Sequence, residues 1–369
     1  MEKIILFGKG QMFDSLLYII EKVGEYEVEE VWDNCESKQG TSIKVLGQNI
    51  IVRKPHNDTK DSLIVITSTI YEEDMRKQLL ADLHISESRI QSWNYCLKSI
   101  KKQIVEKYVN SADEEIIDIL EYLKTNELDV FNNMNLKQKY DLKKTDFEVH
   151  RDPNCGLLYS WWKGKKIYLK RSFSSEKQVQ SYLNGIKKEQ DMESAHCYSQ
   201  RRYKFLADDV IVDGGGAEGF FALENVENVK KIYIIEGEEE WVEALNYTFK
   251  PYREKVEIIP KWLAGAKCEN SITLEELEEK DEITVLKLDI EGAERQVLEG
   301  AFSVLKKDKR MIALICVYHR SMDAQNIKEY MDSLGYKTNF SDGYLFFPFG
   351  EEINPELRRG LLFATKQIE

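Results

Sequence analysis

Two segments of this sequence place acidic residues and glycines where an α/β fold would gather them. In VIVDGGGAEGFFAL, Asp213 follows an apolar run, and a glycine cluster that includes Gly215 and Gly219 precedes a helix-like stretch. Such glycines let a ligand approach the backbone closely, at the carboxyl end of a strand where α/β sheets bind ligands. Glu236 ends the next strand-like run, where a carboxylate can accept hydrogen bonds from both hydroxyls of a ribose. The pattern predicts a nucleoside-containing ligand, and a glycine turn that serves packing alone is the alternative.

The glycine turn has the spacing D-x-G-x-x-x-G and contains no lysine. A phosphate-binding loop for a nucleoside triphosphate uses such a lysine, so a triphosphate is disfavoured. The turn by itself does not distinguish a dinucleotide from S-adenosylmethionine.

A second acidic cluster lies in ITVLKLDIEGAERQVLEGA. Asp289 ends the apolar run, at the carboxyl end of a strand that would face the ligand crevice. Glu291 and Glu294 follow at the start of a helix, where the helix dipole alone also favours carboxylates. Asp289 is therefore the stronger functional candidate.

Three side chains are candidates to remove a proton from an acceptor: His319 after MIALICVY, His196 in SAHCY, and Asp289. His319 is the first choice because its strand would open into the same crevice. The alternative for each histidine is a buried polar group that only satisfies hydrogen bonds. The prediction includes no metal, although Asp289, Glu291 and His319 could alternatively bind a divalent cation.

Aromatic and basic residues interleave between Tyr159 and Phe173, and Trp161 and Arg171 are the candidates there for binding a substrate. The mixture suits a sugar ring with an attached phosphate, and hairpin packing is the alternative. Trp262 is a candidate to stack on an adenine, with a place in the core as the alternative.

The elements that must position these residues alternate in the α/β manner. The runs KIILFG, VEEVWD and LIVITS predict a small Rossmann-like domain over 1–98. Gly8, Gly10 and Asp33 form an imperfect dinucleotide fingerprint there, because Phe13 occupies the third glycine position. A helical connector is expected over 99–145.

Residues 146–369 are expected to form the second domain, beginning with a β-hairpin extension. Five strand-like runs follow, DVIVDGGG, KIYIIEG, KVEIIP, ITVLKLD and MIALICVYH, separated by helix-like stretches. YKTNF, YLFFPF and LLFATK look antiparallel, so a mostly parallel sheet with an antiparallel edge is expected.

Residues 210–366 resemble the FkbM family of S-adenosylmethionine-dependent methyltransferases, and the upstream EQDMESAHCY does so more loosely. The matching pieces are VDGGGAEGFFAL, IIEGEEEWVEAL, TLEEL, VLKLDIEGAERQVLEGA and VYHR. The resemblance implies a class I methyltransferase fold, with a seven-stranded Rossmann-like sheet and an antiparallel edge. The family usually has D-V-G-A at the glycine turn, and often a proline where this chain has Gly237.

The resemblance also implies roles for single residues. Asp213, Gly215 and Gly219 would hold the methionine side of S-adenosylmethionine, and Glu236 its ribose. Asp289 and Glu291 would lie beside the reacting centre. The domain over 1–98 resembles Rossmann-like modules of sugar-modifying enzymes, which bind a nucleotide-linked sugar or mediate assembly, so a homo-oligomer through this domain is expected.

Composition excludes several classes of protein. Lysine and arginine total 52 against 65 aspartate and glutamate, a net charge of −13, which argues against a general affinity for nucleic acid or anionic membranes. The 6 cysteines are scattered without a C-x-x-C pair, so neither disulfides nor a zinc site are indicated. No apolar run approaches the roughly 20 residues of a membrane span, and the opening KIILFG is not a signal sequence. A cytoplasmic protein is expected.

The predicted activity is methylation of a hydroxyl on a sugar or glycan intermediate, using S-adenosylmethionine. His319, Asp289 and His196 are its predicted catalytic residues. Three alternatives remain: N-methylation of an amino sugar or aminoacyl group, a non-catalytic protein that binds a nucleotide-sugar or serves assembly, and a nicotinamide-dependent oxidoreductase, which the missing third glycine disfavours.

Overall fold

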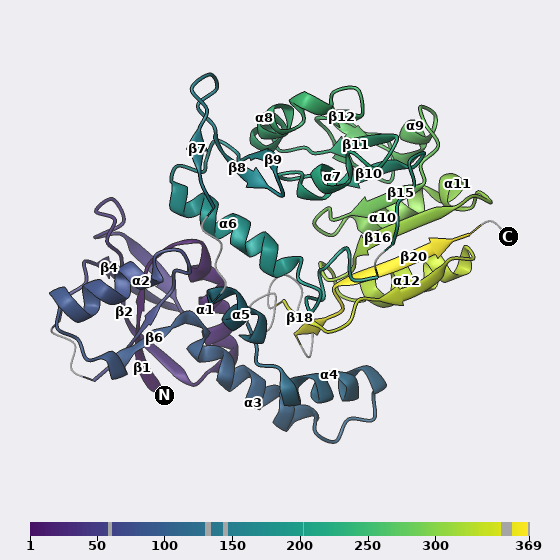
Figure 1. Ribbon diagram of the computed structural model, residues 1–369. Coiled ribbons are helices and arrows are strands. Elements are labelled where there is room, and N and C mark those ends of the chain that lie inside the picture. Colours follow the sequence, from purple (N-terminus) through teal and green to yellow (C-terminus); the bar gives the residue numbers. More distant parts are fainter. Residues whose placement is uncertain (58–60, 130–133, 143–146, 202, 348–355, 368–369) are drawn as a thin grey trace. The chain divides into compact units, whose positions relative to one another are not determined.

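The structure is a computed structural model that describes the chain except residues 58–60, 130–133, 143–146, 202, 348–355 and 368–369 (Figure 1). The chain divides into two compact units, Met1–Asn135 with Phe346–Leu357, and Leu136–Leu345 with Arg358–Glu369. Within the described ranges, every helix is too short or too polar to cross a membrane.

The smaller unit is built on a six-stranded sheet of order β3-β4-β2-β1-β5-β6. Its strands are β1 (Glu2–Phe7), β2 (Tyr26–Trp32), β3 (Ser42–Val45), β4 (Gln48–Arg53), β5 (Leu63–Ile66) and β6 (Ile90–Ser92). Its helices include α1 (Gln11–Val23), α2 (Glu72–Lys77), α3 (Leu97–Tyr108) and α4 (Glu114–Thr125). The pairs are parallel except for the β3–β4 hairpin, and residues 4–7 of β1 are apolar and buried, as in a parallel strand covered on both faces.

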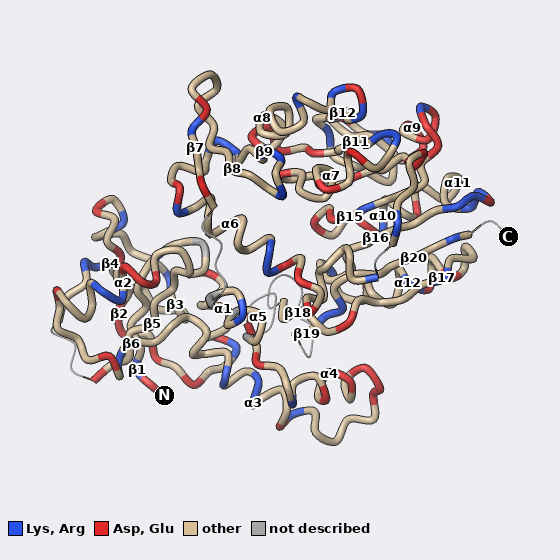
Figure 2. The backbone as a smooth tube through the Cα atoms, in the orientation of Figure 1, with Lys and Arg blue, Asp and Glu red and all other residues tan. Residues whose placement is uncertain are grey.

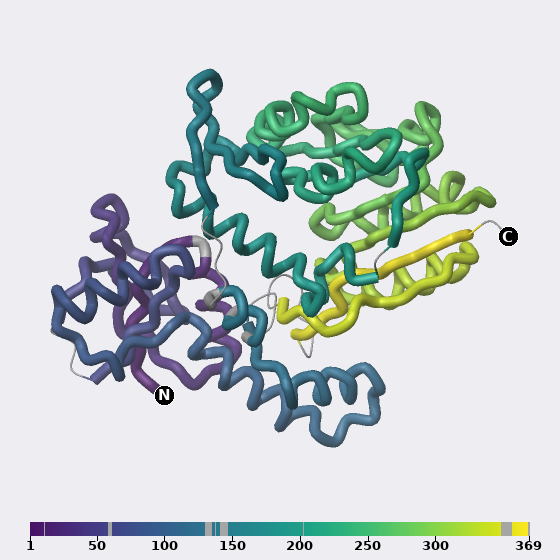
Figure 3. Tube along the Cα trace, in the orientation of Figure 1, coloured from purple at the N-terminus to yellow at the C-terminus, as the bar shows by residue number. Residues whose placement is uncertain are grey.

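The larger unit contains a seven-stranded sheet of order β12-β11-β10-β15-β16-β20-β17. Its strands are β10 (Val210–Gly214), β11 (Lys231–Ile235), β12 (Val256–Ile259), β15 (Val285–Leu288), β16 (Met311–Cys316), β17 (Lys337–Phe340) and β20 (Leu361–Lys366). β20 is antiparallel to both β16 and β17, so the antiparallel strand lies one place in from the edge. Figure 3 shows this C-terminal yellow strand beside the green β16.

The central strands are buried along their whole length. β10, β15 and β16 read VIVDG, VLKL and MIALIC, and each residue of each strand is buried. Parallel strands covered on both faces require such runs. The helices over residues 134–333 are α5 (Met134–Leu142), α6 (Glu176–Glu189), α7 (Phe220–Asn225), α8 (Glu239–Thr248), α9 (Leu274–Glu278), α10 (Glu294–Gly300), α11 (Phe302–Leu305) and α12 (Asp323–Ser333).

The segment predicted to form a hairpin forms a small antiparallel sheet of β7 (His150–Arg151), β8 (Leu158–Trp162) and β9 (Lys165–Tyr168). Helix α6 follows, and it begins at a capping box in which Ser175 and Gln178 satisfy each other's backbone N–H groups. Short paired strands occur elsewhere: β13 (Trp262–Leu263) with β14 (Ser271–Ile272), and β18 (Leu345–Phe346) with β19 (Leu357–Arg358). Acidic (red) and basic (blue) residues are both spread over each unit (Figure 2).

Candidate active site

The glycine turn after β10 brings three strand ends together. Gly215 donates its N–H to the carbonyl of Ile235 at 3.0 Å, and Asp289 donates its N–H to the carbonyl of Gly214 at 3.1 Å. Gly215 has a φ of +74°, and a Cβ there would lie 1.8 Å from the carbonyl oxygen of Asp289. A glycine is therefore required where the ends of β10 and β15 meet.

A buried ion pair between Lys287 and Asp213 stabilises this turn. The Nζ of Lys287 lies 3.0 Å from Oδ1 of Asp213 and donates a hydrogen bond of 2.6 Å to the carbonyl of Gly215. Burial raises the pKa of Asp213, and the charge of Lys287 opposes that shift. Among the described residues, Oδ2 of Asp213 has no hydrogen-bond partner. A buried acceptor of this kind fits a ligand that brings a donor, such as the amino group of S-adenosylmethionine.

Glu236 lies at the end of β11 and is 7% exposed. Its two carboxylate oxygens each accept one backbone N–H at 2.8 Å, from Ala217 and from Glu238. These bonds fix the carboxylate and leave each oxygen a second lone pair, which suits two ribose hydroxyls. A Cβ on Gly237 would lie 2.2 Å from the ring of Trp262, a residue that is 60% exposed. The absence of a side chain at position 237 thus admits an indole that can cover an adenine, and these residues fit S-adenosylmethionine.

Asp289 is the centre of a polar cluster at the end of β15. The hydroxyl of Tyr198 donates to its Oδ2 at 2.8 Å, Nε2 of His196 lies 3.5 Å from the same oxygen, and Nε2 of His319 lies 3.6 Å from Oδ1. Burial opposes ionisation of Asp289, but His196, Lys287 and His319 outweigh it and lower its pKa. Asp289 is therefore a carboxylate that accepts hydrogen bonds.

His319 is held in place by a buried carboxylate. Its Nδ1 lies 2.9 Å from Oε1 of Glu294, which is fully buried and also accepts the N–H of Ile290 at 2.9 Å. Its Nε2 faces Asp289 and Glu291. Burial lowers the pKa of His319, but Glu294, Asp289 and Glu291 together raise it above 6.5. An imidazole oriented at one nitrogen can exchange a proton at the other.

His196 is 2% exposed and contacts the carboxylate of Asp289. Its Nδ1 lies 3.0 Å from Oε1 of Glu189, and its Nε2 lies 3.3 Å from the sulfur of Cys316. Burial lowers the pKa of His196, but Cys316, Glu189 and Asp289 raise it well above its ordinary value. A buried, charged imidazole in contact with Asp289 positions that carboxylate.

Glu291 differs from its neighbours because its carboxylate is 92% exposed and its backbone has a φ of +56°. A left-handed conformation is uncommon for a glutamate. Asp289, Glu294 and His319 also offer donor atoms within 4.8 Å of one another, as do His196, Asp289 and Cys316. The sequence suggested Asp289, Glu291 and His319 as alternative ligands of a divalent cation. In the structure, the carboxylate that lies close to both Asp289 and His319 is that of Glu294.

The two predicted substrate residues of the hairpin region are separated. Trp161 lines a cavity to which Tyr198 also belongs. Arg171 forms an ion pair with Glu243 and donates to the carbonyl of Cys155 at 3.2 Å, so the structure does not bring it to Asp289.

Several residues of the cluster were absent from the sequence prediction of the site. They are Tyr198, Lys287 and Glu189. Glu294 was expected only as a carboxylate at the start of a helix, and its contact with His319 was not predicted. Tyr198 and Glu189 belong to the segment around His196 that resembled the family only loosely, and that resemblance was the available signal.

Comparison with known proteins gives two family matches. The model of the methyltransferase FkbM domain matches residues 265–338, and the model described as C2185-like, N-terminal matches residues 1–91. Similar solved structures include an rRNA methylase from Streptococcus thermophilus, with 15% identity over 44% of this chain and 89% of that chain and a TM-score of 0.31. Another is M. jannaschii TYW2 in complex with AdoMet, with 14% identity over 57% of this chain and 85% of that chain and a TM-score of 0.35. A third is precorrin-6y C5,15-methyltransferase from Geobacter metallireducens, with 9% identity over 47% of this chain and 87% of that chain and a TM-score of 0.33. No curated protein matches the chain significantly.

The FkbM match and the observed sheet order confirm two predictions, the class I methyltransferase fold and the use of S-adenosylmethionine. The expected relation of residues 1–98 to modules of sugar-modifying enzymes stays a prediction, because the match over 1–91 does not address it. The larger unit carries an S-adenosylmethionine-dependent methyltransferase domain.

Proposed function

We propose that this methyltransferase acts on a hydroxyl group of a sugar or glycan intermediate. The observation that supports the proposal is the orientation of His319, whose Nδ1 is engaged by buried Glu294 while its Nε2 faces Asp289. A hydroxyl must lose its proton on methylation, so an oriented imidazole at the carboxyl ends of the central strands suits this acceptor.

When bound, S-adenosylmethionine supplies a methyl group activated by a positively charged sulfur. Asp213, Gly215 and Glu236 hold the donor, and Asp289 with Tyr198 orients the acceptor hydroxyl. Held by these residues, S-adenosylmethionine would supply the methyl group to the acceptor oxygen, and its sulfur would retain the electron pair of the bond to the methyl carbon. His319 accepts the hydroxyl proton at Nε2, and Glu294 stabilises the charge that results.

Calorimetric titration of S-adenosylmethionine into wild type and Glu236→Ala tests the donor site. We expect binding in wild type and a loss of at least tenfold in affinity, or about 1.4 kcal/mol, in the variant, because the charged acceptor of the ribose hydroxyls is removed. Absence of heat in the wild type contradicts the proposal.

Mass spectrometry of native glycans and glycolipids, with and without the protein, tests the acceptor. We expect a methyl group on a sugar oxygen that disappears when the protein is removed. A methyl group found on nitrogen instead would contradict the hydroxyl acceptor and would show that the acceptor is an amine.

A further inference from the structure

A cavity of about 610 Å³ lies between α6, the β8–β9 hairpin and α7 in the larger unit. Glu236 and Gly215, which belong to the proposed donor site, do not line it. Aromatic side chains make up much of its wall, among them Trp161 and Trp162 from β8 and Phe220 from α7. A concave apolar site with a few polar groups is the usual form of a small-molecule site.

Phe220 is the aromatic side chain that joins the two sides of this wall. Its ring centroid lies 6.1 Å from that of Tyr198, nearly parallel at 28°, and 6.1 Å from that of Trp162 at 59°. Phe220 is only partly buried, and Trp161 is 44% exposed. The negative face of an aromatic ring attracts the weakly positive C–H groups of a sugar, so a ring that borders a cavity suits the apolar face of a pyranose.

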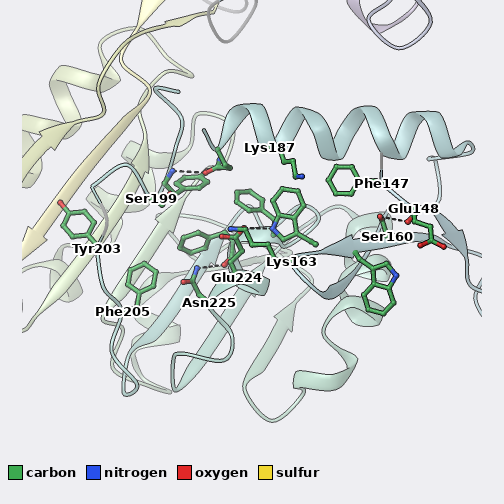
Figure 4. A pocket seen from close by; sticks show the side chains of 16 residues that line it. Phe147, Glu148, Ser160, Lys163, Lys187, Ser199, Tyr203, Phe205, Glu224 and Asn225 are labelled. Carbon is green, nitrogen blue, oxygen red and sulfur yellow. Dashed lines mark hydrogen bonds and ion pairs between the residues drawn. The ribbon is translucent and has the colours of Figure 1, made fainter. Parts of the chain in front are cut away.

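The charges around the cavity balance. Among the described residues of its wall, two lysines and two glutamates carry charge, so the wall as a whole is neutral. Glu224 lies 2.8 Å from Nζ of Lys163. Lys187 lies with its Nζ 4.8 Å from the ring centroid of Phe147 (Figure 4), and Glu148 is largely exposed. A charged ligand would enter without a compensating charge of opposite sign, so an uncharged ligand is favoured.

Two acceptor oxygens at the end of α7 lack partners among the described residues. Glu224 uses only its Oε1, which accepts a hydrogen bond of 2.6 Å from Nε1 of Trp162 and faces Lys163. Asn225 uses only its Nδ2, which donates to the carbonyl of Phe221 at 2.7 Å. Oε2 of Glu224 and Oδ1 of Asn225 can therefore accept hydrogen bonds from a ligand.

The aromatic wall and these oxygens fit the same kind of ligand. Glu224 follows Phe220 by four residues in α7, and residues at this spacing lie on one face of a helix. A molecule that packs on Phe220 can thus direct hydroxyl groups at Glu224. An apolar ring face together with hydroxyl donors, and no net charge, describes an uncharged sugar.

Tyr198 connects this cavity to the reacting centre. Its ring lines the cavity beside Phe220, and its hydroxyl donates to Asp289 at 2.8 Å. A sugar seated against Phe220 therefore lies one aromatic ring away from the carboxylate proposed to orient the acceptor hydroxyl.

Resting on the proposed function, we propose that this cavity binds an uncharged sugar unit of the acceptor. The hydroxyls of that sugar donate to Oε2 of Glu224 and Oδ1 of Asn225, and its apolar face packs on Phe220.

NMR titration of monosaccharides into the full-length protein tests the proposal. The uncharged probes are the methyl glycosides of glucose, galactose and mannose, and the corresponding uronates carry a carboxylate on the same rings. We expect at least one methyl glycoside to bind at least about tenfold more tightly than its uronate, because the uronate brings an uncompensated negative charge to a wall that already contains Glu224.

Two substitutions test the acceptor oxygens. Glu224→Gln keeps an oxygen for Trp162 but removes the charged acceptor, so it is expected to weaken glycoside binding at least about tenfold. Glu227→Gln is its matched control, because Glu227 pairs with Lys165 at 3.2 Å and does not line the cavity. That control should bind the glycoside as wild type does.

Asn225→Ala is also expected to weaken glycoside binding, because the amide oxygen is lost. Asn246→Ala in α8 is its matched control. The amide of Asn246 likewise donates to the carbonyl four residues earlier, that of Val242 at 2.8 Å, and the residue does not line the cavity. Asn246→Ala should leave glycoside binding unchanged.

Calorimetric titration of S-adenosylmethionine into the same variants shows whether each is folded, since none of the substituted residues holds the donor. If the donor binds but no methyl glycoside does, the sugar site is overturned while the proposed function stands. The same holds if the uronates bind more tightly, or if Glu224→Gln and Asn225→Ala bind as wild type does. If the donor does not bind to wild type, the proposed function fails independently of the sugar titration.

Discussion

At the residue scale, His319 makes the rate depend on pH in a defined direction. Its pKa in the folded protein lies above 6.5, and it accepts a proton only when neutral. The rate is therefore low below that pKa and rises as the pH increases through it. His319→Asn is expected to lower kcat by about 10²–10⁴-fold and to remove this rise. Turnover measured across pH checks both effects.

Glu294→Gln sharpens the same test, because it removes the charge that raises the pKa of His319. The rise in rate is then expected at lower pH than in wild type. His150→Gln on the exposed hairpin is the control and should leave the profile unchanged. An unchanged profile in Glu294→Gln would show that another group titrates.

At the scale of elements, the turn between β10 and α7 has no room for a side chain at Gly215. Gly215→Ala would place a Cβ 1.8 Å from a backbone carbonyl in a left-handed conformation. The ends of β10 and β15 would have to separate, so we expect S-adenosylmethionine binding to be lost, as measured by calorimetry. Gly185→Ala in α6 is the matched control, because among the described residues no atom outside its chain neighbours and the backbone of its own helix lies within 4 Å of the added Cβ. That variant should bind the donor normally.

At the scale of the whole molecule, buried Glu218 should make the free energy of unfolding depend on pH. Tyr182 donates to its carboxylate, but burial raises its pKa from 4.5 to about 7. The folded state therefore holds a proton that the unfolded state releases above 4.5. The stabilisation is complete below 4.5 and is lost as the pH rises to about 7, by up to about 3 kcal/mol.

Glu218→Gln should remove this loss, since an amide does not ionise. Denaturant unfolding at about pH 5 and about pH 8 measures the difference, with the exposed Glu239→Gln as control. Equal pH dependence in Glu218→Gln and wild type would show that Glu218 titrates normally.

The smaller unit has its own candidate nucleotide site, but the carboxylate of Asp33 is already engaged. It accepts the N–H groups of Lys9 at 2.7 Å and Cys35 at 2.8 Å, and it pairs with Lys38 at 3.3 Å. A ribose would have to displace Lys38. We therefore expect no enhancement of NADH fluorescence on adding the protein, and unchanged donor affinity in Asp33→Asn. Enhancement that Asp33→Asn abolishes would support the oxidoreductase alternative.

Local sequence patterns predicted much of the fold and part of the candidate site. The apolar runs that predict β10, β11, β15 and β16 are continuous, and the strands follow them closely. Asp213, Glu236 and Asp289 each end such a run, so the topology of an α/β sheet brings them to one edge. The position of β20 between β16 and the edge strand β17 was not predicted. The hydrophobic period and the composition of a C-terminal run do not specify which strand it pairs with.

The sequence by itself determined the order of the elements, the need for glycine at the turn and the carboxyl-end positions of Asp213, Glu236, Asp289 and His319. Only the tertiary structure decided which distant partners meet them. Lys287 on Asp213, Tyr198 and His196 on Asp289, and the aromatic cavity beside Tyr198 all join segments that lie far apart in the chain. Such contacts depend on how strands pair and helices pack, and residue type and local spacing do not carry that information.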